Sequence, residues 1–242
     1  MSQKVALITG AGRRIGRAIA EALARRQYHI AIHCLRNLAD AQTLAKHLLR
    51  RDVKTTVLSG DLGDDHTAYE LVQQTIERLG RLDVLINNAS IWQPNMLLEM
   101  SHASLRQNLT VNMYAPLALS RAFAASQPRG VVVNLLDCRI RDYDYLHASY
   151  HLSKRALRNA TRLLALELAP GFRVNGVAPG LILPPDGSDE TYLHARCHTN
   201  PLQTVGNVSD IAKAVVFLSQ TPSVTGQVIY VDGGRNMAHA VY

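Results

Sequence analysis

The chain has 242 residues, of which 47% are hydrophobic and 19% are charged, a balance that excludes a largely disordered protein. No apolar run approaches the roughly 20 residues of a membrane-spanning helix, and residues 1–6 lead at once into a strand-like stretch, so we expect a cytoplasmic protein without a signal peptide or membrane anchor. The formal net charge of +7 comes from basic residues spread along the helices rather than from one basic tract, so we expect no nucleic-acid partner.

Short apolar runs rich in Val, Ile and Leu recur along the chain and predict strands. They cover residues 5–8, 30–32, 55–58, 84–86, 131–136, 174–177 and 228–231. Between them lie longer segments with apolar residues at helical spacing, such as Ile15, Ile19 and Leu23. This alternation predicts an α/β fold of the Rossmann type, a doubly wound parallel sheet of about seven strands with helices on both faces. No repeat or linker marks a boundary, so we expect residues 1–242 to form a single domain.

A glycine-rich loop follows the first predicted strand directly and opens a helix. It reads Thr9-Gly10-Ala11-Gly12-Arg13-Arg14-Ile15-Gly16. Small residues let a pyrophosphate approach the backbone, and the helix N-terminus offers free N–H groups and a positive dipole. In this context the loop predicts a nicotinamide dinucleotide site.

The end of the second predicted strand bears on which dinucleotide is bound. The segment His33-Cys34-Leu35-Arg36-Asn37 lacks the acidic residue that would hold an adenosine ribose 2′-hydroxyl. Arg36, with Arg13 from the glycine loop, is suited to hold a 2′-phosphate, which favours NADPH over NADH. The alternative is that both arginines are ordinary solvated charges. Asp61 and Leu62 after the third strand, and residues 87–90 after the fourth, extend the same polar rim.

Tyr150 and Lys154 lie four positions apart, so on a helix they share one face. A nearby ammonium favours the phenolate, and we therefore expect Lys154 to lower the pKa of Tyr150 from its usual value of about 10. Tyr150 would then be a usable proton donor or acceptor beside a hydride carrier. The pair occurs together with Asn112 and a Pro179-Gly180 turn.

This whole set resembles the short-chain dehydrogenase/reductase family, over residues 4–234. The resemblance implies that Tyr150 is the general acid, that Lys154 binds the nicotinamide ribose and steers the tyrosine, and that Asn112 holds a proton-relay water. It also implies a homotetramer formed through the helices at 101–126 and 147–168. The implied cofactor-binding residues are Gly10, Arg13, Arg14, Ile15, Gly16, His33, Arg36, Asn37, Asp61, Leu62, Asn88, Ala89, Ser90, Tyr150, Lys154, Pro179, Gly180 and Leu181.

Two residues depart from the family pattern. Arg14 stands where most members have glycine, and Asp137 replaces the serine of the fifth strand. An ionised carboxylate only accepts hydrogen bonds and would repel a developing oxyanion, which makes a simple ketone a poor substrate. A carboxylate beside a tyrosine instead suits a pterin, whose ring offers N–H donors and nitrogens that must be protonated. The combination resembles the pteridine reductase branch, including the bacterial dihydromonapterin reductases.

Trp92 occupies the place at which that branch has an aromatic residue stacked on the pterin. It is the only tryptophan and offers a flat face to a planar heterocycle; the alternative is a tryptophan that fills the core. The residues expected to contact substrate are Arg14, Trp92, Asp137, Tyr150 and Leu181.

The sequence therefore predicts NADPH-dependent reduction of a dihydropterin to a tetrahydropterin, with dihydromonapterin, dihydrobiopterin and dihydrofolate as candidates. Asp137, Tyr150, Lys154 and Asn112 are the expected catalytic residues. Two alternatives stay open, a carbonyl reductase of another substrate class and a non-catalytic nucleotide-binding protein.

The stretch 181–204 breaks any periodic pattern with Pro184-Pro185 and Pro201, and it is either a substrate flap or a long surface loop. The three cysteines and ten histidines form no metal-ligand spacing, so we expect no metal.

Overall fold

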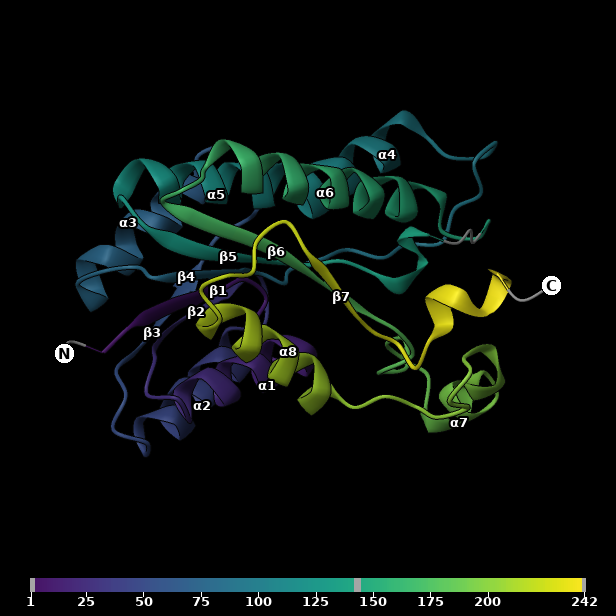
Figure 1. The fold of residues 1–242 in the computed structure, drawn as a ribbon, viewed down its shortest axis with the longest axis horizontal. Coiled ribbons are helices and arrows are strands. Elements are labelled where there is room, and N and C mark those ends of the chain that lie inside the picture. Colours follow the sequence, from purple (N-terminus) through teal and green to yellow (C-terminus); the bar gives the residue numbers. More distant parts are fainter. Residues whose placement is uncertain (1–2, 142–144, 241–242) are drawn as a thin grey trace.

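Seven parallel strands form one sheet in the computed structural model, which describes residues 3–141 and 145–240 (Figure 1). The strands are β1 (Val5–Ile8), β2 (His29–Cys34), β3 (Thr55–Ser59), β4 (Val84–Asn87), β5 (Gly130–Leu135), β6 (Phe172–Pro179) and β7 (Val228–Val231). Their order is β3-β2-β1-β4-β5-β6-β7, so the chain changes direction across the sheet between β1 and β4. Ligands of such sheets bind at the carboxyl ends of the strands beside this switch point. The predicted fold class is confirmed.

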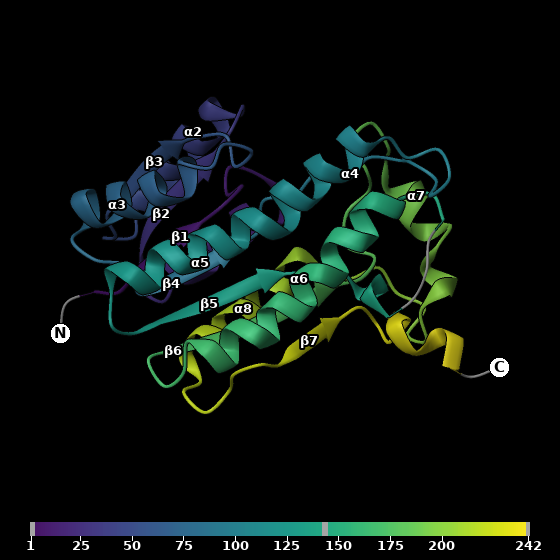
Figure 2. The same cartoon turned by 90° about the horizontal axis from the view of Figure 1, so that it is seen from above.

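Helices cover both faces of the sheet, as Figures 1 and 2 show. One face carries α1 (Arg14–Ala24), α2 (Leu38–Leu49) and α8 (Val208–Gln220), and the other carries α3 (Thr67–Leu79), α5 (Ala115–Ser126) and α6 (Ala148–Glu167). A further helix, α4 (His102–Leu109), runs through a π-helical turn (Thr110–Tyr114) into α5. Such turns inside longer helices are frequent at functional sites.

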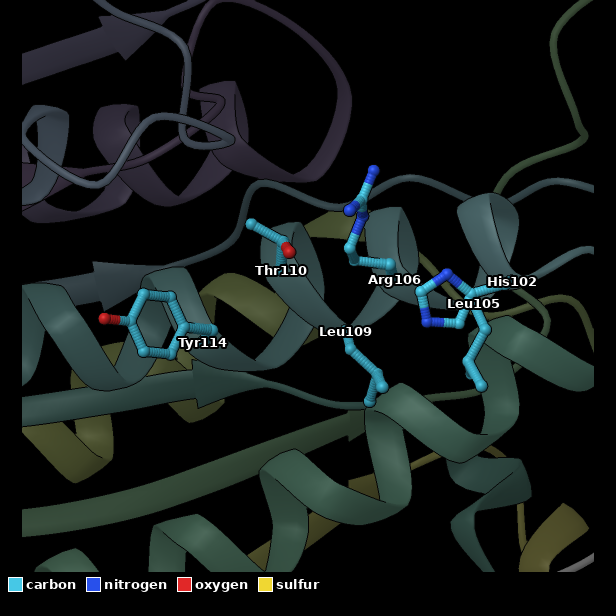
Figure 3. A pocket seen from close by; sticks show the side chains of 6 residues that line it. All are labelled: His102, Leu105, Arg106, Leu109, Thr110 and Tyr114. Carbon is cyan, nitrogen blue, oxygen red and sulfur yellow. The ribbon is translucent and has the colours of Figure 1, made fainter.

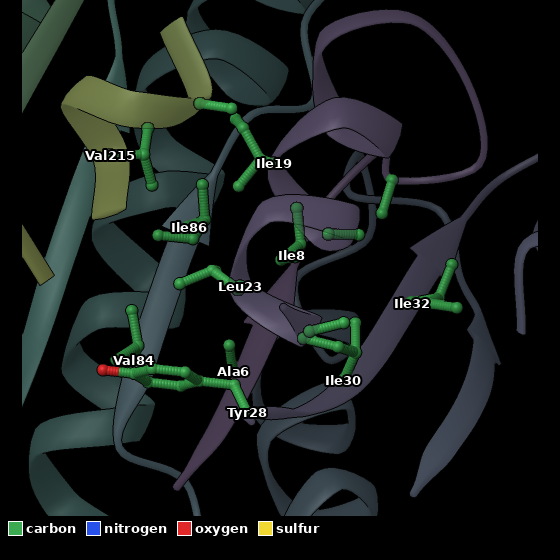
Figure 4. Close-up of a cluster of buried hydrophobic side chains, with 14 of the residues drawn as sticks. Ala6, Ile8, Ile19, Leu23, Tyr28, Ile30, Ile32, Val84, Ile86 and Val215 are labelled. Atoms are coloured by element: carbon green, nitrogen blue, oxygen red, sulfur yellow. The ribbon is translucent and has the colours of Figure 1, made fainter. Parts of the chain in front are cut away.

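The hydrophobic cores on the two faces of the sheet explain why most strand residues are apolar. Successive strand residues point to opposite faces, so Ile8 packs toward α1 and α8 with Ile86, as Figure 4 shows, while Leu7 packs toward α3 and α5 with Phe123. A strand buried on both sides needs apolar residues at every position.

The segment from 181 to 204 is less irregular than its sequence indicates. It contains the short helix α7 (Glu190–His194) and a 3-10 turn (Cys197–Thr199). Figure 1 places α7 beyond the carboxyl end of the sheet, beside the 3-10 helix (Arg235–Ala240) near the C-terminus. Within the described residues, no helix combines the length and apolar character needed to cross a membrane.

Candidate active site

The glycine loop after β1 is tied to the loop after β4. Gly10 has a φ of +63°, and a Cβ on Gly16 would collide with the carbonyl oxygen of Gly10. The Thr9 hydroxyl accepts hydrogen bonds from the backbone N–H groups of Asn88 (2.9 Å) and Ala89 (3.0 Å), and the Asn88 side chain donates to the Thr9 carbonyl at 2.9 Å. These contacts hold the glycine loop in place at the N-terminus of α1, where the free N–H groups and the helix dipole suit a phosphate group.

Arg14, the first residue of α1, has a φ of +55°. This left-handed conformation favours glycine, which explains why most members of the short-chain dehydrogenase/reductase family have glycine at this position. The Arg14 guanidinium donates to the carbonyl of Pro184 at 2.6 Å, and Arg13 and Arg14 each contact the Asp186 carboxylate at 3.1 Å. The glycine loop and the 181–204 segment are therefore joined by charged contacts.

His33, which the sequence placed among the cofactor-binding residues, is 2% exposed and contacts the glycine loop from the protein interior. Its Nδ1 accepts the backbone N–H of Gly10 at 3.3 Å, so its Nε2 carries the proton and donates to the carbonyl of Gly60 at 3.0 Å. Burial lowers the pKa of His33, which keeps the ring neutral. Arg36 is exposed and Asn37 half-buried at the same strand end, so their polar side chains can reach a ligand.

Asp61 and Leu62 follow the end of β3. The Asp61 carboxylate is exposed and accepts the backbone N–H of Gly63 at 2.8 Å, while the Leu62 side chain is buried against the core. Asp61 thus offers a polar side chain at the rim, and Leu62 can offer a ligand only its backbone.

Tyr150 and Asp137 form the centre of the candidate site. The Tyr150 hydroxyl donates to Oδ2 of Asp137 at 2.9 Å, and Oδ1 of Asp137 accepts the backbone N–H of Arg139 at 2.7 Å. Lys154 lies on the same side of α6, with its Nζ 5.8 Å from the centroid of the Tyr150 ring, and donates to the carbonyl of Leu135 at 2.8 Å. The end of β5 and the first turns of α6 therefore bring these side chains together.

The pKa of Tyr150 shifts in the direction opposite to our expectation. Burial raises it well above 10, and the negative charge and hydrogen bond of Asp137 raise it further. Burial also lowers the pKa of Lys154 to about 8. The expectation failed because it considered the lysine alone, whereas the tyrosine is buried and is also in direct contact with a carboxylate. Tyr150 therefore holds its proton at neutral pH and is a donor.

Asn112 lies buried in the π-helical turn and links three segments. Its Oδ1 accepts the backbone N–H of Ile91 at 2.9 Å and the hydroxyl of Ser90 at 3.0 Å, and its Nδ2 donates to the hydroxyl of Ser153 at 3.0 Å. Ser153 in turn donates to the carbonyl of Tyr150 at 2.6 Å. The Asn112 side chain thus fixes the loop after β4 against α6, a role that the sequence did not indicate.

Trp92 is 43% exposed, so the alternative that it fills the core is wrong. Its ring stacks on that of His147, with centroids 4.0 Å apart and planes 14° apart. Asn95 holds the two loops together, because its backbone N–H donates to the carbonyl of Leu146 and its carbonyl accepts from Ala148. The stack joins residues 55 positions apart, so no local sequence pattern indicates it.

Pro179, Gly180 and Leu181 lead from β6 into the 181–204 segment. The Gly180 backbone N–H donates to the carbonyl of Val231 at 3.0 Å, and a Cβ at Gly180 would collide with Asp232. Leu181 is buried at the start of the segment.

A separate hollow of about 310 Å³ lies on α4 and the π-helical turn (Figure 3). It is lined by His102, Leu105, Arg106, Leu109, Thr110 and Tyr114, and it contains none of the residues expected to act in catalysis. Among the described residues, no three His, Cys, Asp or Glu side chains are grouped so that they could hold a metal ion.

Comparison with known proteins gives consistent similarities. A family model described as enoyl-(acyl carrier protein) reductase matches residues 10–236. Pteridine reductase 1 from Leishmania tarentolae is 33% identical over 281 residues, covering 98% of this chain and 97% of that protein. The 3-oxoacyl-(acyl-carrier-protein) reductase FabG from Staphylococcus aureus is 29% identical, covering 97% and 98%. The crystal structure of FolM alternative dihydrofolate reductase 1 from Brucella canis complexed with NADP superposes with a TM-score of 0.92 at 34% identity, covering 97% and 94%.

Proposed function

The chain belongs to the short-chain dehydrogenase/reductase family, and we propose that within this family it is an NADPH-dependent pterin reductase. Membership of this family makes it an oxidoreductase, and the similar solved structures that hold NADP support this cofactor; both argue against a non-catalytic nucleotide-binding protein.

The residues of the glycine loop fit an NADP cofactor. A Cβ on Gly16 would collide with the Gly10 carbonyl oxygen and the Asn88 side chain, so glycine at this position lets the loop and the start of α1 pack closely together. Gly10, Ile15 and Gly16 would hold the pyrophosphate there, with Asn88, Ala89 and Ser90 beside the nicotinamide half. Arg13 and Arg36 are exposed and would hold the 2′-phosphate, with Asn37 beside them.

The observation that carries the substrate assignment is the Tyr150–Asp137 hydrogen bond. A ketone becomes an oxyanion during reduction, and a carboxylate in hydrogen-bond reach of the acid would repel it. A dihydropterin presents N–H donors, for which a carboxylate is the matching acceptor. Asp137 therefore favours a nitrogen heterocycle over a carbonyl compound.

The pterin ring would lie against Trp92, whose other neighbour is the ring of His147. Stacking on a rigid aromatic pair orients a planar substrate. Arg14 and Leu181 would close the pocket from the glycine loop and from the end of β6. Residues 181–204 would then act as the substrate flap of a domain that spans residues 1–242.

The catalytic residues donate one proton to the substrate, and Tyr150 then regains a proton from solvent. When bound, NADPH delivers a hydride to the carbon of a C=N bond, and the nitrogen of that bond must be protonated. Tyr150 holds the proton on its hydroxyl because its pKa is raised well above 10. Asp137 keeps that hydroxyl oriented and returns a proton to it from solvent, while the Lys154 ammonium holds the nicotinamide ribose.

A carbonyl reductase acting on acyl thioesters is the second candidate. The similarity to the FabG reductase and the description of the matching family model favour it. The two candidates differ in the effect of Asp137, whose carboxylate would accept hydrogen bonds from a pterin but repel the oxyanion formed from a carbonyl compound.

The experiment is an NADPH oxidation assay with dihydromonapterin, dihydrobiopterin and dihydrofolate, run beside an acetoacetyl thioester and a panel of ketones. We expect turnover with at least one pterin and none above background with the carbonyl compounds. The opposite pattern would establish the carbonyl reductase.

The active form is proposed to be a cytoplasmic homotetramer. Leu163 and Leu166 on α6 are 64% and 78% exposed, and burying such leucines between subunits is favourable. Size-exclusion chromatography with light scattering is expected to give four times the mass of one chain.

A further inference from the structure

A carboxylate from the 181–204 segment lies between two arginines of the glycine loop. Oδ2 of Asp186 is 3.1 Å from Nη2 of Arg13, and Oδ1 is 3.1 Å from Nη1 of Arg14. Nη2 of Arg14 also donates to the carbonyl of Pro184 at 2.6 Å. Arg14 and Asp186 are 172 positions apart, so the fold rather than local sequence brings them together.

A tight turn holds Asp186 in this place. The backbone N–H of Ser188 donates to the carbonyl of Pro185 at 3.0 Å, and Gly187, the third residue of the turn, has a φ of +87°. A type II turn requires a positive φ at that position, which glycine adopts without strain. Pro184 and Pro185 stiffen the chain before it. The contact with the arginines is thus supported by a constrained backbone.

The Asp186 carboxylate uses donors that a phosphate would use. Guanidinium N–H groups bind carboxylate and phosphate oxygens in the same geometry, and the proposed function assigns Arg13 to the 2′-phosphate. We propose that Asp186 is a tethered competitor for the cofactor's 2′-phosphate at Arg13, so that NADPH binding breaks the Arg13–Asp186 ion pair and leaves the 181–204 segment joined to the glycine loop through Arg14 alone. The inference rests on the proposed role of Arg13 and is independent of which substrate is reduced.

The three side chains are well exposed, at 54% for Arg13, 39% for Arg14 and 66% for Asp186. Ion pairs in water are weak, because solvent screens both charges. A phosphate dianion can therefore displace the carboxylate, and the competition should change affinity by about three- to tenfold.

The test compares cofactor binding to three forms of the full chain by titration calorimetry with NADPH and with NADH. D186N removes the competing charge. E190Q makes the same charge change four residues later, at an exposed glutamate that forms no ion pair within the described residues, and is the matched control. We expect D186N to tighten NADPH about three- to tenfold and NADH less than about twofold, and E190Q to match the wild type.

Unchanged or weaker NADPH binding by D186N would overturn the proposal. An equal gain with NADH would overturn it too, because NADH has no 2′-phosphate to compete. The Arg13 contact is checked in an R13A background, where D186N should add nothing; an undiminished gain there would exclude Arg13 as the contested residue. Pterin turnover is measured separately, so a failure of this inference is distinguishable from a failure of the proposed substrate.

Discussion

The hydroxyl of Tyr150 donates to the carboxylate of Asp137 across 2.9 Å, from the first turns of α6 to the end of β5. This contact and the burial of the tyrosine keep the phenol protonated. The site is thereby set for donating a proton, which suits reduction. The same carboxylate makes the site a poor one for a developing oxyanion.

Replacing Trp92 by alanine should raise the KM for a dihydropterin about tenfold, because the stacking surface is lost. NADPH affinity and kcat should change little, since the glycine loop and Tyr150 are untouched. W92F keeps an aromatic face and serves as the control, with a KM close to wild type. Steady-state kinetics check both variants, and an unchanged KM in W92A would remove Trp92 from the pocket.

Replacing Arg14 by glycine separates backbone strain from side-chain function. A non-glycine residue at a φ of +55° costs about 1 kcal/mol or more, and glycine removes that cost while making the unfolded chain more flexible. We expect the free energy of unfolding to stay within about 1 kcal/mol of wild type in urea titrations. The pterin KM should rise about tenfold from loss of one charged contact. R14K keeps the charge, so its pterin KM should lie between those of wild type and R14G. A stable R14G with wild-type kinetics would exclude Arg14 from the pocket.

The pH profile of turnover should follow Lys154. Its pKa is lowered by burial to about 8, so the amine loses its proton and its positive charge as the pH rises through that value. kcat/KM should then fall about tenfold per pH unit above pH 8. Arginine stays protonated there, so K154R should lack this alkaline decline, whatever its absolute rate. A wild-type profile that is flat well above pH 8 would contradict the assignment.

Stability should depend on His33 in mildly acidic solution. Its pKa in the folded state lies below the usual 6.5, so the unfolded chain binds a proton that the folded one does not. Stability is therefore complete above about pH 6.5 and declines below it, by up to about 1.4 kcal/mol per pH unit. Urea unfolding of wild type and H33Q on both sides of pH 6.5 checks this. H33Q should lose less stability than wild type on acidification, and an equal loss would exclude His33 as the cause of the decline.

Much of the fold follows from the sequence because the central strands are buried on both faces. The predicted strands at 5–8 and 228–231 match β1 and β7, and the other five differ from the structure only at their ends. Ends are harder to predict, since residues such as His29 and Pro179 are held in strands by the neighbouring ladder rather than by their own apolar character.

The site was less predictable because its contacts join distant segments. The Tyr150 and Lys154 spacing is visible in the sequence, but the pKa of the tyrosine is raised by its burial in the fold and further by Asp137, 13 positions away. The stack of Trp92 on His147 and the reach of Asp186 to the glycine loop leave no sequence pattern at all. The sequence shows that Arg14 replaces the usual glycine, but only the structure shows that this arginine adopts a left-handed backbone conformation.

The most direct test of the central claim is the specificity of the Asp137→Ser variant, measured as kcat/KM for a dihydropterin and for an acetoacetyl thioester, with calorimetric NADPH binding as the control for folding. We predict a loss of pterin turnover of about 100-fold or more, typical of removing a group that serves acid–base catalysis, with NADPH affinity unchanged and carbonyl turnover no lower than in wild type. Full pterin activity in this variant would exclude Asp137 from pterin reduction.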